Sequence, residues 1–140
     1  MIDASVFVNA FLSHEEGNEE SRAVLRKLYD EGRALLAPAL LLPEVASALA
    51  RGQGDTELAR RFADALRRLP HLTLLPLDSV LGQEAADLAA TYRLRGADAV
   101  YVAVARRFEA ALVTRDNEQR QRGATVVQTL SPAEALRDVT

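Results

Sequence analysis

Four acidic residues stand as isolated charges within apolar segments of this 140-residue chain: Asp3, Glu44, Asp98 and Asp116. Burying a lone carboxylate is costly, and a hard cation is one of the few partners that satisfies several carboxylates together. Four such groups converging on one place would repel one another strongly without a cation. The pattern therefore predicts that these side chains form a metal site.

Each acid also has a structural explanation when it is taken alone. Asp98 and Asp116 can be helix N-caps, and Asp3 can lie exposed near the terminus. Glu44 can complement the dipole in the first turn of a helix. Caps are much commoner than metal sites, but all four acids in apolar surroundings favour the joint interpretation. The remaining acids fall on polar faces or in loops and are expected to be solvated, among them Glu15, Glu16, Glu19, Asp30, Glu57 and Asp64.

The available ligands restrict the metal. The chain has no cysteine, which excludes thiolate sites, disulfides and cysteine nucleophiles. Its two histidines, His14 and His71, are flanked by loop-like sequence and are expected to be exposed. Carboxylates without thiolate or imidazole suit Mg²⁺ or Mn²⁺, which keep several waters and accept phosphate oxygens. Such a site can activate water and stabilise the leaving oxygen of a phosphodiester, which is nuclease chemistry.

The elements that would position these acids alternate between strand and helix. Apolar, β-branched runs predict strands at residues 1–8, 33–37, 72–77, 111–114 and 125–128. Apolar residues at helical spacing predict helices at residues 18–29, 40–51, 55–69, 78–92 and 97–108. Gly32 and Gly52 are expected to end the first two helices, and Asp55 and Asp78 to cap the next two. A helical turn after Asp116 and a terminal helix opened by a capping box at residues 131–134 complete the prediction.

This alternation predicts an α/β fold, a three-layer α/β/α sandwich with a mostly parallel central sheet. Its length and 49% hydrophobic content fit one domain over residues 1–140, and no internal repeat or linker is present. Folds of this class place their sites beyond the carboxyl ends of the strands. Asp3 and Asp116 are expected at or near strand ends, and Asp98 at the start of the most apolar helix, which we expect to be central and buried.

Composition limits the partners. The net charge of −3 argues against attraction to nucleic acid by overall basicity. Nearly all the positive charge is arginine, Lys27 being the sole lysine, which reflects either a compositional bias or contacts with phosphates. The longest apolar stretches are far shorter than the roughly 20 residues that a membrane span requires. We therefore expect a soluble, cytoplasmic protein without membrane association.

The ordered segments around the acids resemble those of PIN-domain ribonucleases, and within them the toxin subunits of VapBC toxin–antitoxin pairs. The matching segments are IDASVFVNAFL with Asp3 and Ser5, LLPEVASAL with Glu44, LRGADAVYVAVA with Asp98, and LVTRDNEQ with Thr114 and Asp116. The resemblance implies that the four acids are catalytic ligands of Mg²⁺ or Mn²⁺, with a hydroxyl of Ser5 or Thr114 orienting a ligand or water. It also implies endonucleolytic cleavage of RNA by a metal-activated water, inhibition by a small antitoxin, and a homodimer.

The chain departs from the family pattern at two points. Only two residues precede Asp3, where family members have several apolar residues, so the first strand is expected to be truncated or to begin late. Some members carry a further Asp shortly after the position of Asp116, where this chain has Asn117 and Glu118. Glu118 is either an outer ligand or an exposed helical residue.

Arginines flank the acidic segments and are either contacts for the RNA backbone or ordinary surface residues: Arg93, Arg95, Arg115, Arg120 and Arg122. Of these, Arg95 and Arg115 are the candidates for RNA contacts. The aromatic stacking motifs of common RNA-binding sheets are missing, so sequence-specific binding of that type is not expected.

Two other functions also gather acids in an α/β domain. A receiver-type or phosphatase-type domain does so, but a receiver needs a late lysine, and Lys27 lies in the first predicted helix. A catalytically silent PIN-like module that binds a protein partner or regulates its own operon remains open. The predicted helices 18–29 and 40–50 carry surplus apolar residues, which predicts a groove for an amphipathic partner helix at Leu25, Leu28, Leu40, Leu41, Leu42 and Val45.

Overall fold

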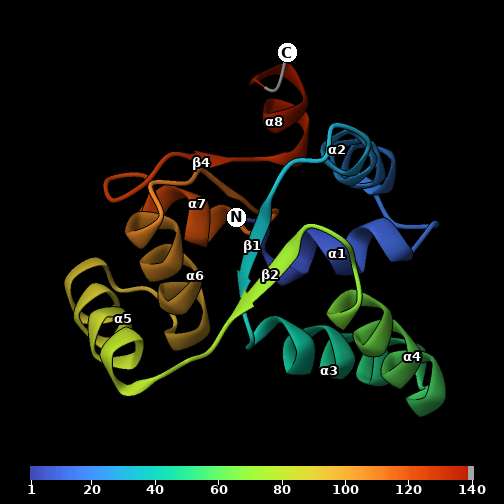
Figure 1. Cartoon of the computed structure of the whole chain (residues 1–140), viewed down its shortest axis with the longest axis horizontal. Helices are drawn as coiled ribbons and strands as arrows, with labels where there is room; N and C mark the ends of the chain where they lie inside the picture. Colours follow the sequence, from blue (N-terminus) through green and yellow to red (C-terminus); the bar gives the residue numbers. More distant parts are fainter. Residues whose placement is uncertain (139–140) are drawn as a thin grey trace.

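Short parallel strands lie between two groups of helices in the computed structural model, which describes residues 1–138 (Figure 1). The strands are β1 (Leu35–Pro38), β2 (Leu72–Leu75), β3 (Leu112–Val113) and β4 (Thr129–Leu130). The helices are α1 (Ala4–Phe11), α2 (Asn18–Asp30), α3 (Leu41–Gln53), α4 (Thr56–Arg67), α5 (Ser79–Tyr92), α6 (Gly96–Arg107), α7 (Asn117–Gly123) and α8 (Pro132–Asp138). The predicted alternation of helices with parallel strands is confirmed. Within the described residues, no helix has both the length and the apolar character to cross a membrane.

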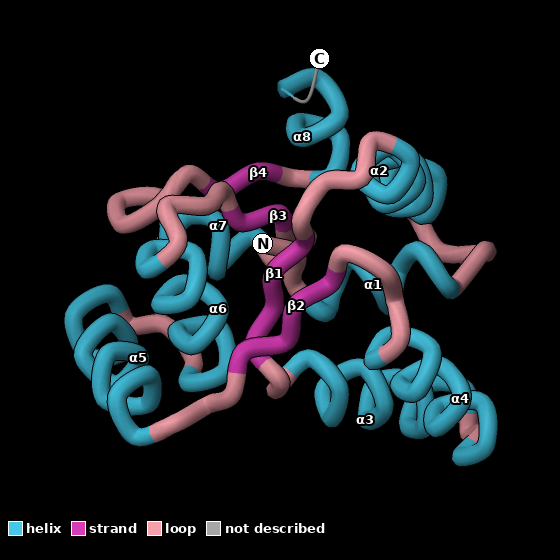
Figure 2. The backbone as a smooth tube through the Cα atoms, in the orientation of Figure 1, coloured by secondary structure: helices cyan, strands magenta, loops and turns pink. Residues whose placement is uncertain are grey.

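The strands form two parallel pairs that the N-terminus connects (Figure 2). Leu35 pairs with Leu72 in the first sheet, and Leu112 pairs with Thr129 in the second. Between them, the Ile2 amide donates to the Leu36 carbonyl at 3.3 Å and the Asp3 amide donates to the Val113 carbonyl at 3.0 Å. The first residues therefore lie between β1 and β3, which leaves Asp3 at the end of this central segment.

The predicted first strand at residues 1–8 is wrong beyond its first residues. Only Ile2 forms a β-bridge, with Val113, and the chain turns into α1 directly after Asp3. The Asp3 carboxylate accepts a hydrogen bond from the Ser5 amide at 2.9 Å and so caps this helix. The β-branched Val6 is fully buried as a helical residue, because tertiary packing overrides a weak intrinsic preference for strand.

The next helices follow the sequence prediction closely. Asp55 and Asp78 cap α4 and α5 through their side chains, as predicted. The end of α3 differs, because Gly52 stays helical and Gly54, with φ of +64°, occupies the left-handed position that ends the helix. Gly54 therefore ends α3, two residues after the predicted Gly52.

The last predicted strand is displaced. Residues 125–127 form a turn in which the amides of Val126 and Val127 donate to the Gly123 carbonyl, so β4 begins only at Thr129. The capping box that follows is confirmed: the Ser131 amide donates to Glu134 at 2.7 Å, and the Glu134 amide donates to the Ser131 hydroxyl at 3.2 Å.

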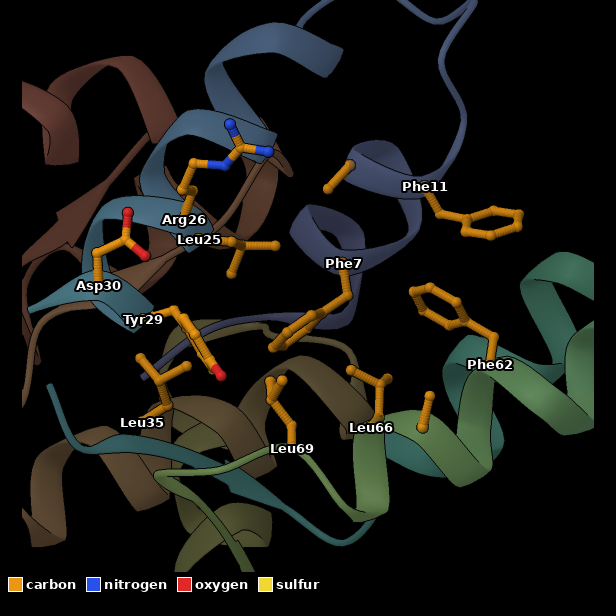
Figure 3. Close-up of a pocket in the computed structure, with 12 residues that line it drawn as sticks. Phe7, Phe11, Leu25, Arg26, Tyr29, Asp30, Leu35, Phe62, Leu66 and Leu69 are labelled. Carbon is orange, nitrogen blue, oxygen red and sulfur yellow. The ribbon is translucent and has the colours of Figure 1, made fainter. Parts of the chain in front are cut away.

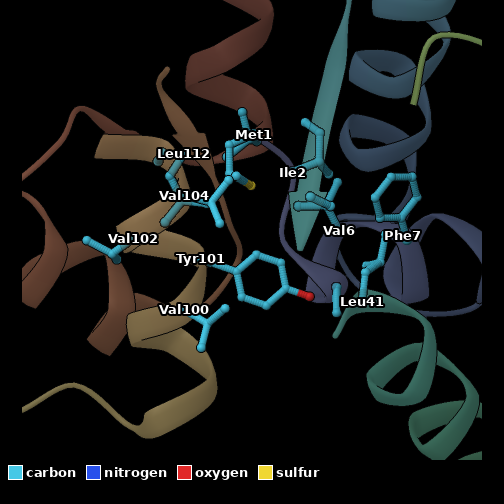
Figure 4. Packing of buried hydrophobic residues seen from close by; sticks show 14 of the residues in the cluster. Met1, Ile2, Val6, Phe7, Leu41, Val100, Tyr101, Val102, Val104 and Leu112 are labelled. Atoms are coloured by element: carbon cyan, nitrogen blue, oxygen red, sulfur yellow. The ribbon is translucent and has the colours of Figure 1, made fainter. Parts of the chain in front are cut away.

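The hydrophobic core surrounds α6. Every residue from Ala99 to Ala105 is buried, which confirms the prediction that this helix is central. In Figure 1, α5, α6 and α7 lie on one side of β1 and β2, and α1, α3 and α4 lie on the other. Figure 4 shows Tyr101 extending from α6 toward Val6 of α1 and Leu41 of α3. The buried ring thus bridges the helices that carry Asp98, Asp3 and Glu44 at their N-terminal ends.

Candidate functional site

All four acids singled out from the sequence line one cavity of about 350 Å³. Asp3 precedes α1 and Asp116 precedes α7, each as the N-cap of its helix. Glu44 and Asp98 lie in the first turns of α3 and α6. Four segments that are distant in the sequence therefore bring their carboxylates to the same hollow, at the N-terminal ends of four helices.

Two of the acids, Asp3 and Asp116, cap a helix and line the cavity at the same time. For Asp3 the alternative of an exposed residue near the terminus is wrong, because it is only 7% exposed and accepts from the Ser5 amide. Asp116 accepts from the Gln119 amide at 3.0 Å. Asp98 caps nothing, because Arg95 is the N-cap residue of α6 and makes no side-chain cap bond. Its place in an apolar first turn thus has no capping explanation.

The cavity disfavours negative charge on Asp98. Burial is the main cause that raises the pKa of Asp98 from 3.8 to about 6, and the neighbouring charges of Asp116 and Asp3 raise it further. Arg95 offsets part of this rise, whereas Glu44 adds to it. Mutual repulsion therefore reaches across all four acids, which a divalent cation would relieve.

The ionised form of Glu44 is disfavoured in the same way. Burial raises its pKa, the Tyr101 hydroxyl lowers it in part, and the charge of Asp3 raises it again. Yet neither Glu44 Oε1 nor Tyr101 Oη has a partner in hydrogen-bonding geometry among the described residues. Burial and the charges of Glu44 and Asp3 raise the pKa of Tyr101 so far that it stays a neutral phenol. Tyr101 is a neighbour of the acids that the sequence interpretation missed, because it reads as an ordinary core residue.

The two hydroxyl residues hold the chain around the acids together. Ser5 Oγ lies 3.4 Å from Thr114 Oγ1. The Arg115 amide donates to Ser5 Oγ and the Asp116 amide donates to Thr114 Oγ1, both at 3.1 Å. Ser5 lines the cavity, and Thr114 is fully buried beside it. Their role in orienting a ligand or water remains a prediction.

Of the arginines that flank the acidic segments, Arg95 and Arg115 line the cavity. Arg95 lies 3.9 Å from Asp116 and 3.1 Å from Glu118, and its side chain is largely exposed. Arg115 donates from Nη2 to the Glu16 carbonyl at 2.8 Å, which fixes its guanidinium at the rim. Both are thus available beside the acids for contacts with a polyanion.

The side chains of Arg120 and Arg122 are engaged elsewhere. Arg120 bonds Glu134 at 2.8 Å, and Arg122 bonds both Glu118 and the Arg93 carbonyl. Glu118 therefore pairs with Arg95 and Arg122 and does not line the cavity, which favours its interpretation as a helical surface residue over that as an outer metal ligand.

Two polar residues that line the cavity, Glu15 and Asn9, were not anticipated from the sequence. Glu15, expected to be a solvated charge, lines the cavity rim and accepts from Asn9 Nδ2 at 3.2 Å. Asn9 is 1% exposed and also bonds the Ser21 hydroxyl and the Glu16 carbonyl. Asn9 directly follows the residues predicted as a strand, and the sequence assigned no hydrogen-bond partner to it.

The donor set fits a hard divalent cation such as Mg²⁺ or Mn²⁺. The four acids offer only oxygen ligands, and the buried Glu44 Oε1 has no hydrogen-bond partner among the described residues. As the side chains stand, no three His, Cys, Asp or Glu side chains within residues 1–138 are grouped closely enough to hold a metal ion. Asp3 and Asp116 each direct an oxygen to a backbone amide, and the acids must come closer together before three of them can share one cation.

A second, larger cavity of about 550 Å³ is apolar and lies between α1, α2 and α4 (Figure 3). We call it the apolar groove, and its main lining residues are Phe7, Phe11, Leu25, Tyr29, Phe62 and Leu66. The rings of Phe11 and Phe62 meet edge to face, with centroids 4.7 Å apart. Of the residues predicted to form a partner groove, Leu25 of α2 lines this cavity, whereas Leu41 and Val45 of α3 are fully buried in the core.

The chain belongs to the PIN-domain family, whose model matches residues 1–124. Members of this family are generally nucleases that use divalent metal ions. The resemblance inferred from the acidic segments is therefore confirmed at the level of the family.

Solved toxin–antitoxin structures share this fold. A chain of VapBC2 from Rickettsia felis, bound to a DNA fragment from its promoter, has a TM-score of 0.69 and 14% identity, covering 94% of this chain and 96% of that one. A chain of FitAcB from Neisseria gonorrhoeae has a TM-score of 0.68 and 21% identity, with coverage of 94% and 96%. A toxin–antitoxin complex from Klebsiella pneumoniae gives 0.63 and 16%, with coverage of 94% and 95%. Among curated proteins, no sequence matches this chain.

Proposed function

We propose that this protein is a metal-dependent endoribonuclease and the toxin of a type II toxin–antitoxin pair. The observation that carries the proposal is the convergence of Asp3, Glu44, Asp98 and Asp116 on one cavity, where burial and their mutual charges raise the pKa of Asp98 to about 6. Family membership supports nuclease chemistry, and the fold shared with toxin–antitoxin structures supports the biological role.

The four acids would hold Mg²⁺ or Mn²⁺. When bound, the ion would activate water and stabilise the leaving oxygen of an RNA phosphodiester. Asp98 and Glu44 give up their carboxyl protons most readily when a cation is present, because their raised pKa values arise from burial and like charge. Asp3 and Asp116 are held by backbone amides and so keep a defined position at the cavity wall.

The residues around the acids have separate proposed tasks. Ser5 follows Asp3 and Thr114 precedes Asp116, and the contact between their side chains holds these two segments together. One of the two hydroxyls orients a water or ligand. Arg95 and Arg115 contact the RNA backbone, because a cleft of four carboxylates admits a polyanion only with cations at its rim. The partial pairing of Arg95 with Asp116 would loosen as RNA binds.

We further propose that a small antitoxin inhibits the enzyme and inserts an amphipathic helix into the apolar groove. The lining of the groove is mainly apolar, and Phe11 and Tyr29 stay partly exposed at its edge. Arg26 and Asp30 stand at the rim and offer charges of both signs for register. A homodimer and a cytoplasmic location complete the proposal, and sedimentation equilibrium of the purified protein tests the dimer.

The experiment that tests the nuclease is cleavage of a single-stranded RNA by the purified, inhibitor-free protein with Mg²⁺, with Mn²⁺ and with excess EDTA. We expect cleavage only with metal, and its loss in Asp98→Asn and Asp116→Asn with the helical circular dichroism unchanged. Asp87→Asn on the exposed face of α5 is the matched control and should cleave normally. Cleavage that persists in EDTA, or equal cleavage by all variants, would overturn the proposal. A well-folded protein that binds antitoxin but never cleaves RNA would instead establish the silent protein-binding module.

A further inference from the structure

We infer that Gln119 is a positioning residue that fixes the Asp3 carboxylate relative to Asp116 in the acidic cavity. The inference rests on the proposed metal-dependent function and adds a residue to it. Gln119 lies in the first turn of α7 and does not itself line the cavity. It acts through the two acids that it contacts.

Gln119 touches both acids, one through its main chain and one through its side chain. Its backbone amide donates to Asp116 Oδ1 at 3.0 Å, and its side-chain Nε2 donates to Asp3 Oδ1 at 3.5 Å. The other oxygen of Asp3 accepts from the Ser5 amide. Both carboxylate oxygens of Asp3 therefore face a donor, and the weaker contact comes from Gln119.

The burial of Gln119 is unusual for its chemistry. The residue is 0% exposed, although glutamine is mostly found at protein surfaces. Its Oε1 has no hydrogen-bond partner among the described residues, so the amide is only half satisfied. A leucine or methionine would fill this space without an unpaired polar atom. Burying the unpaired Oε1 costs free energy, which indicates that the amide of Gln119 has a role beyond packing.

A neutral donor at this place suits a cation site. A carboxylate at position 119 would add to the repulsion already felt by Asp98, and a lysine or arginine would neutralise Asp3 and compete with a metal ion. An amide orients Asp3 without changing the charge of the cavity. At 3.5 Å the contact is also long for a hydrogen bond, so it guides the carboxylate while leaving lone pairs of Oδ1 for a cation.

The test compares Gln119→Met with wild type in Mn²⁺ binding, measured by titration of the metal-free protein, and in RNA cleavage. Methionine keeps the length and volume of the side chain but has no N–H to donate. We expect a Kd for Mn²⁺ about 10–100-fold higher and a matching fall in kcat, with KM for RNA unchanged, as for other residues that orient metal ligands. Gln121→Met, on the exposed side of the same helix, should change none of these quantities.

If Gln119→Met folds poorly, the variant Gln119→Asn and crystal structures without metal test the same role. Gln119→Asn retains the amide but is one methylene too short to reach Asp3, and we expect it to weaken Mn²⁺ binding similarly. Crystal structures of the metal-free variants should show Asp3 rotated or disordered. Unchanged Mn²⁺ affinity in a folded variant, with wild type binding normally, would overturn the role of Gln119 alone. No Mn²⁺ binding by wild type would overturn the proposed metal function and this role with it.

Discussion

Asp98→Asn tests most directly whether the four acids share one electrostatic environment. Burial, followed by the charges of Asp116 and Asp3, raises the pKa of Asp98 from 3.8 to about 6. The charged form is thus disfavoured in the folded protein compared with the unfolded chain. Asparagine has nearly the same size and no charge, and Asp98 makes no capping bond that the change would break. The substitution therefore removes the strain and leaves the packing in place.

The sign of the effect follows from proton binding. Between pH 3.8 and about 6 the folded protein binds more protons than the unfolded chain, so wild-type stability falls as the pH rises through this window. The destabilisation is complete above about pH 6 and absent below the unfolded pKa. It amounts to at most about 3 kcal/mol, and partial exposure of Asp98 screens some of it. We expect metal-free Asp98→Asn to be about 1–3 kcal/mol more stable than wild type near neutral pH.

The assay is urea denaturation in EDTA across this pH window, with Asp87→Asn as the control that should follow wild type. Added Mn²⁺ should then reverse the order. Wild type should gain roughly 2.7 kcal/mol at a hundredfold excess over Kd, and Asp98→Asn should lose most of that gain. Parallel pH profiles for wild type and Asp98→Asn, or equal responses to Mn²⁺, would refute a shared site that includes Asp98.

Two further predictions concern the apolar groove and the buried phenol. Tyr29→Asp changes a residue that is 48% exposed at the edge of the groove, and it should weaken antitoxin binding at least tenfold while RNA cleavage stays unchanged. The control Phe108→Asp changes an apolar residue that is 45% exposed outside the groove and should alter neither quantity. Equal antitoxin binding by the two variants would exclude this groove as the binding site. Tyr101→Phe removes a buried hydroxyl without a bonding partner among the described residues, so the free energy of unfolding should fall by less than about 1 kcal/mol or rise. A loss of more than about 2 kcal/mol in equilibrium denaturation would instead show that the hydroxyl bonds Glu44.

Local patterns in the sequence predicted most helices well. The caps at Asp55 and Asp78 and the box at residues 131–134 are short-range hydrogen bonds, so neighbouring residues are enough to specify them. The apolar run of α6 likewise predicts a buried helix whatever its partners are. The failures lie at residues 1–8 and 125–128, where β-branched residues favoured strand and longer-range contacts decided otherwise.

The four acids that line the cavity could be identified in the sequence, since isolated acids in apolar segments indicate carboxylates that fold inward. The sequence also identified the family through the order of those segments, which the family match over residues 1–124 confirms. It could not find Gln119, Tyr101 or Glu15, because a glutamine, a tyrosine and a surface-like glutamate carry no signal of their own.

Residue types and their order thus determined which groups are available here, namely hard oxygen ligands, no thiolate, and arginines beside the acids. The tertiary structure alone decided their distances: it brought Asp3, Glu44, Asp98 and Asp116 to one cavity by bringing the starts of four helices together. It also decided that Asp98 and Glu44 are disfavoured as anions and that Gln119 lies behind Asp3. The physical reason is that burial and charge repulsion act through space, between residues that the sequence separates by up to 113 positions.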